Sequence, residues 1–122
     1  MKLQQDRSNH LIVTAYGDDY VDINRERHET GLILLPERII TPWCAGGFTS
    51  LTEVDMQQLA DLSVDVVLIG TGTQQRFPTP SLLRSLIEAQ RGYEVMNLAA
   101  ACRTYNVLAG EGRNVAVALM LN

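Results

Sequence analysis

The stretch that decides the fold is Val64-Asp65-Val66-Val67-Leu68-Ile69-Gly70-Thr71-Gly72, residues 64–72. Its first six residues are apolar except for Asp65, and a run that is apolar on both faces is typical of a central strand covered by layers on both sides. Gly70 ends this run. We therefore predict a buried strand over 64–69, followed by a glycine-rich loop at its carboxyl end, where α/β proteins usually place their ligands.

Helical patterns lie on both sides of this strand. Thr52 and Asp55 have the spacing of a capping-box variant, and the apolar spacing after them predicts a helix over about 53–62. Thr79-Pro80 supplies an N-cap followed by proline, which predicts a second helix that runs until Gly92. The core-facing residues expected in the first helix are Val54, Met56, Leu59 and Ala60, and those expected in the second are Leu82, Leu83, Leu86 and Ile87.

The carboxyl third contains one more helix between two further strands. Residues 93–96 form a short strand pattern, and Asn97 is positioned to cap a third helix that ends at Gly110. This helix carries one continuous apolar stripe, formed by Leu98, Ala101, Cys102, Tyr105, Leu108 and Ala109. Residues 115–121 are apolar at every position, so we expect an interior strand beside or near the strand at 66–69.

The amino-terminal third is mostly β. Residues 11–16 and 20–24 are short β-type runs joined by a polar connection of hairpin length, and 32–35 and 38–43 are further extended pieces. Strands that then alternate with helices imply right-handed crossovers. The predicted fold is a three-layer α/β domain with a largely parallel sheet, three helices and an added amino-terminal β-hairpin layer, formed as one domain by residues 1–122.

Composition limits the possible functions. The chain has 122 residues, of which 46% are hydrophobic, enough for one ordinary core. Its net charge of -4 opposes phosphate neutralisation, so we expect no nucleic-acid partner. No apolar stretch approaches the about 20 residues of a membrane span. Met1 to His10 lacks the pattern of a targeting segment, and two distant cysteines suit reduced thiols, so we expect a cytoplasmic protein.

The glycine-rich loop is the first candidate site. Glycine lets backbone N–H groups approach an anion and polar side chains add donors, which suits phosphate or carboxylate. The candidate residues are Gly70, Thr71, Gly72, Thr73 and Gln74, with Asn106 from the third helix. However, the pattern is GxGxxQ, and the next helix begins well after the loop. We therefore favour a turn that needs small residues as it leaves a buried strand.

A second polar cluster is interleaved with the apolar stripe of the third helix and the turn after it. It consists of Arg103, Thr104, Asn106, Glu111 and Arg113. Asn106 lies beside the stripe, so we expect its amide to fix a neighbouring segment by hydrogen bonds. Glu111 and Arg113 flank Gly112, where they form either an ion pair or a solvated turn.

The other reactive side chains give no catalytic or metal-binding pattern. Cys102 lies in the middle of the apolar stripe, so we expect a buried thiol with a raised pKa, which is a poor nucleophile. His10 and His28 lack metal-ligand spacing, and we expect no metal and no cofactor. Trp43 is either a core side chain or an aromatic anchor on a partner surface, and both alternatives stay open.

Four segments together resemble a known family. They are NRERHETGLILLP at 24–36, Trp43, VVLIGTGTQ at 66–74 and AAACRTYNVLAGEGRNVAVAL at 99–119. The chain is similar to an uncharacterised bacterial and archaeal family whose mitochondrial relatives include the respiratory complex I assembly factor 3 proteins. The resemblance implies a mixed sheet with one antiparallel strand. It also carries over Gly70, Thr71, Gly72, Gln74, Arg103, Thr104, Tyr105, Asn106, Glu111 and Arg113 as motif residues.

Two functions follow as hypotheses. Most members of this family have no established reaction, while the mitochondrial branch implies an assembly helper that acts through protein contacts. We therefore favour a non-enzymatic accessory protein with a protein partner, in which a respiratory complex is one possible target. The alternative is a protein or enzyme that binds a small anionic ligand at the Gly-Thr-Gly loop. The sequence determines neither the partner nor the oligomeric state.

Overall fold

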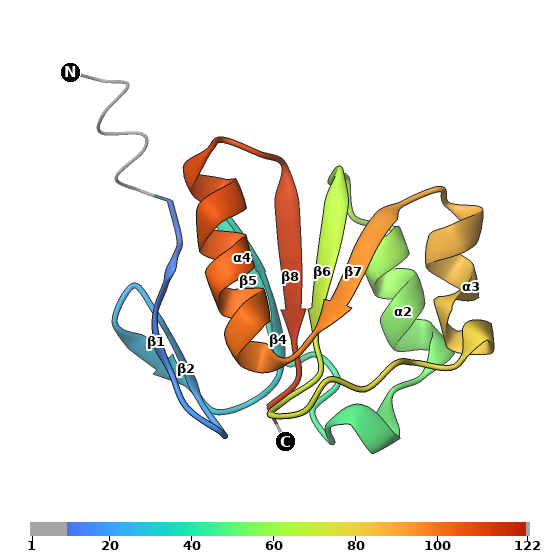
Figure 1. Ribbon diagram of the computed structural model, residues 1–122, viewed down its shortest axis with the longest axis horizontal. Helices are drawn as coiled ribbons and strands as arrows, with labels where there is room; N and C mark the ends of the chain where they lie inside the picture. The colour runs from blue at the N-terminus through green and yellow to red at the C-terminus, as the bar shows by residue number, and fades with distance from the viewer. Residues whose placement is uncertain (1–9, 122) are drawn as a thin grey trace.

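The computed structural model describes residues 10–121 and arranges them in two β-sheets and three α-helices (Figure 1). Residues 1–9, for which the sequence predicts no targeting segment, lie outside the described residues. The smaller sheet has the order β1-β2-β3, formed by β1 (Val13–Tyr16), β2 (Val21–Ile23) and β3 (Glu26–His28). Both pairings are antiparallel. The predicted hairpin is therefore present, and the unforeseen strand β3 extends it to three strands.

The larger sheet has the order β5-β4-β8-β6-β7. Its strands are β4 (Leu32–Leu35), β5 (Arg38–Ile40), β6 (Val66–Gly70), β7 (Gly92–Met96) and β8 (Val115–Leu119). β6 pairs in parallel with β7 and β8, whereas β4 pairs antiparallel with both β5 and β8. It follows that β4 alone runs against the other four strands. The mixed, mostly parallel sheet with one antiparallel strand is confirmed.

β6 and β8 form the interior of this sheet. Val66 lies opposite Val115 and Gly70 opposite Leu119, which confirms that the two apolar runs are neighbouring strands. Every residue of β8 is buried. Because successive side chains in a strand point to opposite faces, β6 and β8 contribute to both hydrophobic clusters of the molecule, one on each face of the sheet.

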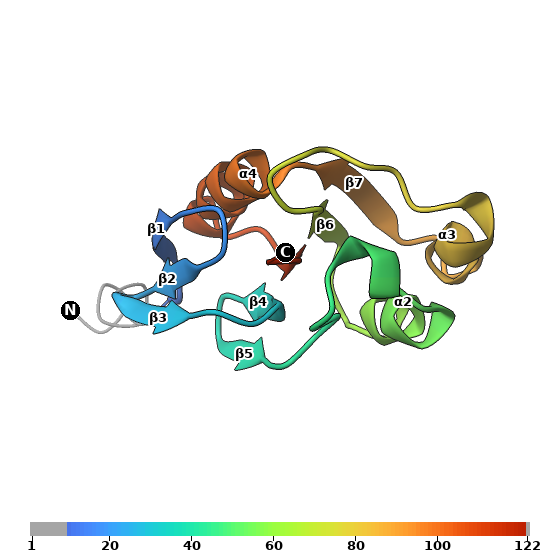
Figure 2. The same cartoon turned by 90° about the horizontal axis from the view of Figure 1, so that it is seen from below.

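The helices cover the two faces of the larger sheet separately. α2 (Glu53–Ala60) and α3 (Pro80–Glu88) lie on one face, and α4 (Leu98–Gly110) and the small sheet lie on the other (Figure 2). A short 3-10 helix, η1 (Phe48–Ser50), precedes α2. The result is the predicted three-layer α/β architecture with three helices and an added β layer.

α2 and α4 start with the capping hydrogen bonds that the sequence predicts, whereas α3 starts after Thr79 without a side-chain capping bond. Thr52 Oγ1 accepts a hydrogen bond from the Asp55 N–H at 3.2 Å, and the Asp55 carboxylate accepts one from the Thr52 N–H at 3.0 Å. Asn97 Oδ1 accepts from the Ala100 N–H at 2.9 Å. The core expectation for Val54 was wrong, because this side chain is 76% exposed at the start of α2. Ile87 of α3 is 55% exposed, which was also not expected.

Trp43 belongs to the core. Its side chain is 2% exposed, and its indole Nε1 donates a hydrogen bond to the Asp55 carbonyl oxygen at 3.1 Å. The aromatic ring packs in the hydrophobic cluster beneath α2, where it buries a large apolar area while its one donor is satisfied. The alternative of Trp43 as an exposed partner-surface anchor is therefore wrong.

Candidate functional site

The Gly-Thr-Gly loop follows β6 and is centred on a buried hydroxyl. Thr71 is 0% exposed, and its Oγ1 donates to the Gln74 carbonyl oxygen at 2.6 Å and accepts from the Arg76 N–H at 3.0 Å. The Thr71 N–H donates to the Met96 carbonyl oxygen at 2.9 Å. The donors that an anion would need at Thr71 are thus directed at the protein's own backbone.

The two glycines have different structural roles in this loop. A Cβ at position 70 would lie 2.9 Å from the Ala101 Cβ, so Gly70 allows α4 to pack closely on β6. Gly72 has a φ of 88°, in the left-handed region that favours glycine. Its carbonyl oxygen accepts from the Leu98 N–H at 2.6 Å, which joins the loop to the start of α4. Both roles favour the interpretation of this loop as a turn that needs small residues, rather than as an anion-binding loop.

A small open cavity lies beside the loop. Its volume is about 230 Å³, and it is lined by Tyr16, Gly17, Asp18, Thr73, Asn97, Leu98 and Ala99. Of the predicted ligand residues only Thr73 lines it, and Asp18 adds an acidic side chain to its wall. The structure does not bring Thr71, Gln74 and Asn106 together around this cavity.

Asn106 joins α4 to the small sheet. Its Oδ1 accepts from the Val13 N–H at 3.0 Å, and its Nδ2 donates to the Val13 carbonyl oxygen at 2.8 Å. The amide therefore pairs with the β1 backbone as a neighbouring strand would. This confirms the expectation that Asn106 fixes a neighbouring segment by hydrogen bonds.

Tyr105, one residue before Asn106, also ties α4 to the segment that leads into the small sheet. Its ring is 0% exposed, and its hydroxyl donates to the Leu11 carbonyl oxygen at 2.8 Å. Burial raises the pKa of the Tyr105 hydroxyl well above its ordinary value, and the Glu37 carboxylate acts in the same direction. A neutral phenol that donates to a backbone carbonyl is a structural group.

The remaining residues of this motif lie nearer the surface. The exposed Arg103 guanidinium donates to the Tyr16 hydroxyl at 3.2 Å, so it also contacts β1, and Thr104 is half-buried. Glu111 and Arg113 are exposed in the turn after α4. No ion pair joins these two side chains in the structure of residues 10–121, so the solvated-turn alternative holds.

The two cysteines are buried in separate clusters. Cys44 lies in the cluster with α2 and α3, and Cys102 lies in the cluster with α4 on the opposite face of the sheet. Burial raises the pKa of the Cys102 thiol to about 12, although the nearby Arg103 opposes this, and burial also raises the pKa of Cys44. Cys102 thus has the environment of an unreactive thiol, as expected.

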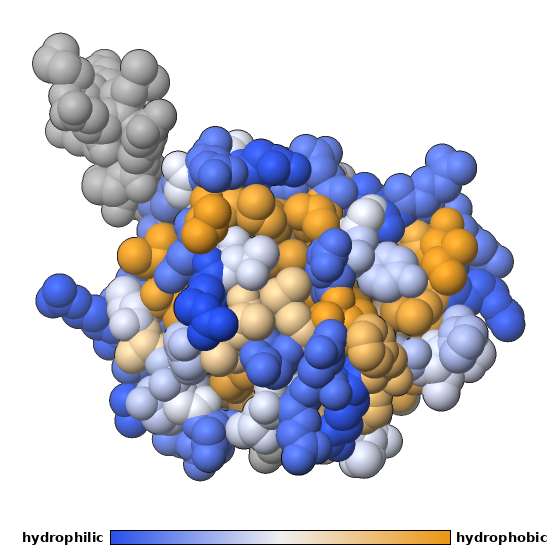
Figure 3. All heavy atoms as spheres, in the orientation of Figure 1, coloured by the Kyte–Doolittle hydropathy of each residue, from blue (hydrophilic) through white to orange (hydrophobic). Residues whose placement is uncertain are grey.

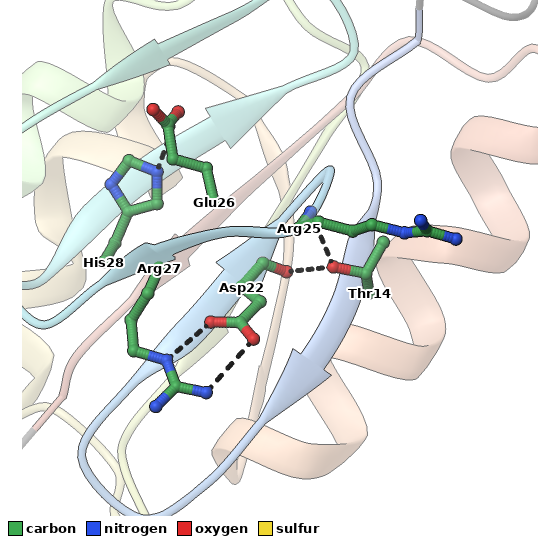
Figure 4. Close-up of polar contacts among 6 residues, drawn as sticks. All are labelled: Thr14, Asp22, Arg25, Glu26, Arg27 and His28. Atoms are coloured by element: carbon green, nitrogen blue, oxygen red, sulfur yellow. Dashed lines mark hydrogen bonds and ion pairs between the residues drawn. The ribbon is translucent and has the colours of Figure 1, made fainter.

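The small sheet carries polar side-chain pairs on both of its faces (Figure 4). The Arg27 guanidinium donates to Asp22 at 2.9 and 3.2 Å, and this contact lowers the pKa of the Asp22 carboxyl while desolvation opposes the shift. His28 Nε2 lies 3.9 Å from the Glu26 carboxylate. Across the described part of the chain, no three His, Cys, Asp or Glu side chains are grouped so that they could hold a metal ion.

Sequence analysis missed one surface feature of the loop that leaves β6. Phe77 is 68% exposed, and the Arg76 guanidinium carbon lies 5.4 Å from the centre of the Phe48 ring. The adjacent Arg and Phe in a polar loop were the available signal. Contact with Phe48 could not be foreseen, because it depends on how η1 and the loop meet at one end of the sheet.

The fold and these contacts define a small α/β domain with a mixed sheet and an added β layer. Most of the predicted motif residues serve to hold parts of this fold together. The chain belongs to the family described as "Protein of unknown function (DUF498/DUF598)", whose model matches residues 13–120. Within the described residues, none of the helices is both long enough and apolar enough to span a bilayer.

The relatives include proteins named NADH dehydrogenase [ubiquinone] 1 alpha subcomplex assembly factor 3. The Drosophila melanogaster protein is 31% identical over 90% of this chain and 58% of its own length. The Bos taurus protein is 26% identical over 97% of this chain and 65% of its own length. The chain therefore spans about three fifths of the curated relatives it matches. These matches confirm the resemblance to the assembly-factor family.

A solved structure shows the same fold. The crystal structure of a Bordetella parapertussis protein superposes with a TM-score of 0.84 at 37% sequence identity. The match covers 93% of this chain and 97% of the other.

Proposed function

We propose that this chain is a cytoplasmic, non-enzymatic accessory protein that acts through protein–protein contacts, in the manner of a factor that assists assembly of a respiratory complex. The observation that carries the proposal is the similarity to the assembly factor 3 proteins, which extends over at least 90% of the chain in both relatives. Because those relatives are longer, any further activity of theirs is not transferred to this chain.

The contacts of the motif residues support this function. Thr71, Tyr105 and Asn106 use their polar atoms to hold the loop, the segment before β1 and β1 itself in place. A catalytic serine, cysteine or histidine would need an orienting partner and an accessible reacting atom. The buried Cys102 thiol, with its pKa near 12, does not supply one.

The alternative, an anionic ligand at the Gly-Thr-Gly loop, has weaker support. The cavity beside the loop includes Thr73 and lies near the amino terminus of α4, which is the observation in its favour. However, Asp18 lines the same cavity, and a carboxylate there opposes the binding of an anion. The Asn97 side chain already caps the first turn of α4.

A deletion experiment tests the proposal. In a cell that makes both this chain and a respiratory NADH dehydrogenase, we expect its deletion to lower the amount of fully assembled enzyme on native gels and to leave the subunit transcripts unchanged. Restoring the intact chain should restore assembly. Normal assembly in the deletion strain would contradict a respiratory target, and loss of a single metabolic conversion instead would favour an enzyme.

A further inference from the structure

An exposed aromatic and basic patch lies where the loop after β6 meets η1. We define the Phe48–Arg76–Phe77 patch by its three side chains: Phe77 is 68% exposed, Phe48 is half-buried and Arg76 lies over the Phe48 ring. In Figure 1 the loop, η1 and the start of α3 gather at the end of the molecule toward which β6 and β7 point. Figure 3 shows that apolar atoms also reach the surface over α3.

The Arg76 guanidinium has no anionic partner among residues 10–121. Its Nε is buried and makes no hydrogen bond, and no ion pair involves this side chain in the described part of the chain. A guanidinium has five N–H donors, and only Nε of Arg76 is among the buried unpaired atoms, so an incoming carboxylate would meet the two terminal nitrogens. Arg91 has a buried and unpaired Nε as well, but it differs from Arg76 because its two terminal nitrogens donate to the Val64 and Ala60 carbonyl oxygens at 2.7 and 3.0 Å.

The surroundings of Arg76 favour an incoming negative charge. The first turn of α3, which follows the loop, contains no acidic residue, and the Thr79 side chain makes no capping hydrogen bond there. The chain as a whole carries a net charge of -4, so a patch with an unpaired cation differs from its average surface. Arginine and aromatic side chains are enriched among residues that dominate binding energy at protein interfaces.

We propose that the Phe48–Arg76–Phe77 patch is the docking site for a segment of a partner protein that presents an Asp or Glu carboxylate beside an apolar side chain. The carboxylate pairs with the Arg76 guanidinium, and the apolar side chain covers Phe77 and the edge of Phe48. This assignment rests on the proposed function as a protein-binding accessory factor, and it names the surface and the chemistry of the partner.

Peptide titration tests the chemistry. We would titrate the labelled chain with the blocked peptide acetyl-Gly-Leu-Glu-Phe-Gly-amide and with its Gln counterpart, following amide resonances by NMR. Saturable shifts are expected at residues 48–50 and 75–79, with the Glu peptide binding about tenfold more tightly, as for one charge-assisted hydrogen bond. Arg76→Gln should remove this preference. Equal affinity for the two peptides, or no shift at these residues, would overturn the proposal.

Matched variants separate this proposal from the proposed function. Phe77→Ser should weaken binding of both peptides, whereas Val107→Ser, which changes an exposed apolar residue on α4, should not. Arg113→Gln is the matched control for Arg76→Gln. In capture from the native cell, a partner retained by both patch variants would overturn the docking site and leave the proposed function standing. The absence of any partner for the unmodified chain would count against the function itself.

Discussion

Replacing Thr71 by Val tests whether the Gly-Thr-Gly loop is a structural turn. The substitution keeps the branched shape and removes the hydroxyl, so packing changes little. Lost with the hydroxyl are the 2.6 Å bond to the Gln74 carbonyl oxygen and the 3.0 Å bond from the Arg76 N–H. Because Thr71 is fully buried, water does not replace these partners easily.

The size of the effect follows from these two hydrogen bonds. Each contributes about 0.5–1.5 kcal/mol net, and a buried N–H left without a partner costs about 1–3 kcal/mol. We therefore expect Thr71→Val to lower the free energy of unfolding by about 2 kcal/mol. With a slope of about 2 kcal/mol per molar urea, the unfolding midpoint should fall by about 1 M.

Two control variants complete this experiment. Thr71→Ser keeps the hydroxyl and should recover most of the lost stability, and Thr73→Val changes an exposed threonine two residues away, so it should alter stability by less than about 0.5 kcal/mol. The assay is urea unfolding followed by circular dichroism. A Thr71→Val protein as stable as the unmodified chain would refute the structural role of this hydroxyl.

Further outcomes follow from the same structure. Asn106→Ala should lower the free energy of unfolding by about 2 kcal/mol and increase amide exchange in residues 13–28. Asn114→Ala, which removes one exposed hydrogen bond, should lower this free energy by under about 1 kcal/mol. Unchanged exchange in Asn106→Ala would argue against the role of Asn106 in joining α4 to β1. Gly72→Val should cost about 2 kcal/mol because its φ is 88°, and an equally stable variant would be contrary evidence. The pKa of Cys102 is about 12 in the folded chain and 9.0 ordinarily, so its contribution to folding stability is complete below about pH 9 and is lost as the pH rises toward 12. Cys102→Ala should therefore reduce the decline of stability over this pH range. An identical decline in the variant would contradict the raised pKa of Cys102. If residues 1–122 form one domain, urea unfolding should be a single transition by two probes, and separate midpoints would contradict it.

Local patterns predicted the layers of the fold. The apolar runs at 66–69 and 115–121 identified the interior strands because both of their faces are covered. The caps at Thr52 and Asn97 were readable because capping involves residues only three positions apart. Strand β3 escaped prediction because Glu-Arg-His is polar, and it is held by pairing with β2 rather than by burial.

The candidate site was predicted less completely. Side-chain type showed that Thr71 and Asn106 are able to make hydrogen bonds, but the loop alone could not reveal that Thr71 bonds within its own turn. Asn106 contacts Val13 across 93 positions of sequence, a distance that no local pattern spans. For the same reason the burial of Trp43 against α2 was only one of two alternatives until the fold was known.

Native mass spectrometry of the chain, isolated gently from its own cell, tests the central claim most directly. We predict a complex with one or more proteins in fixed stoichiometry, from which the chain dissociates with both thiols reduced and no small molecule attached. A chain that instead carries a stoichiometric anionic metabolite, and no protein partner, would contradict the accessory function and make the Gly-Thr-Gly loop the leading functional site.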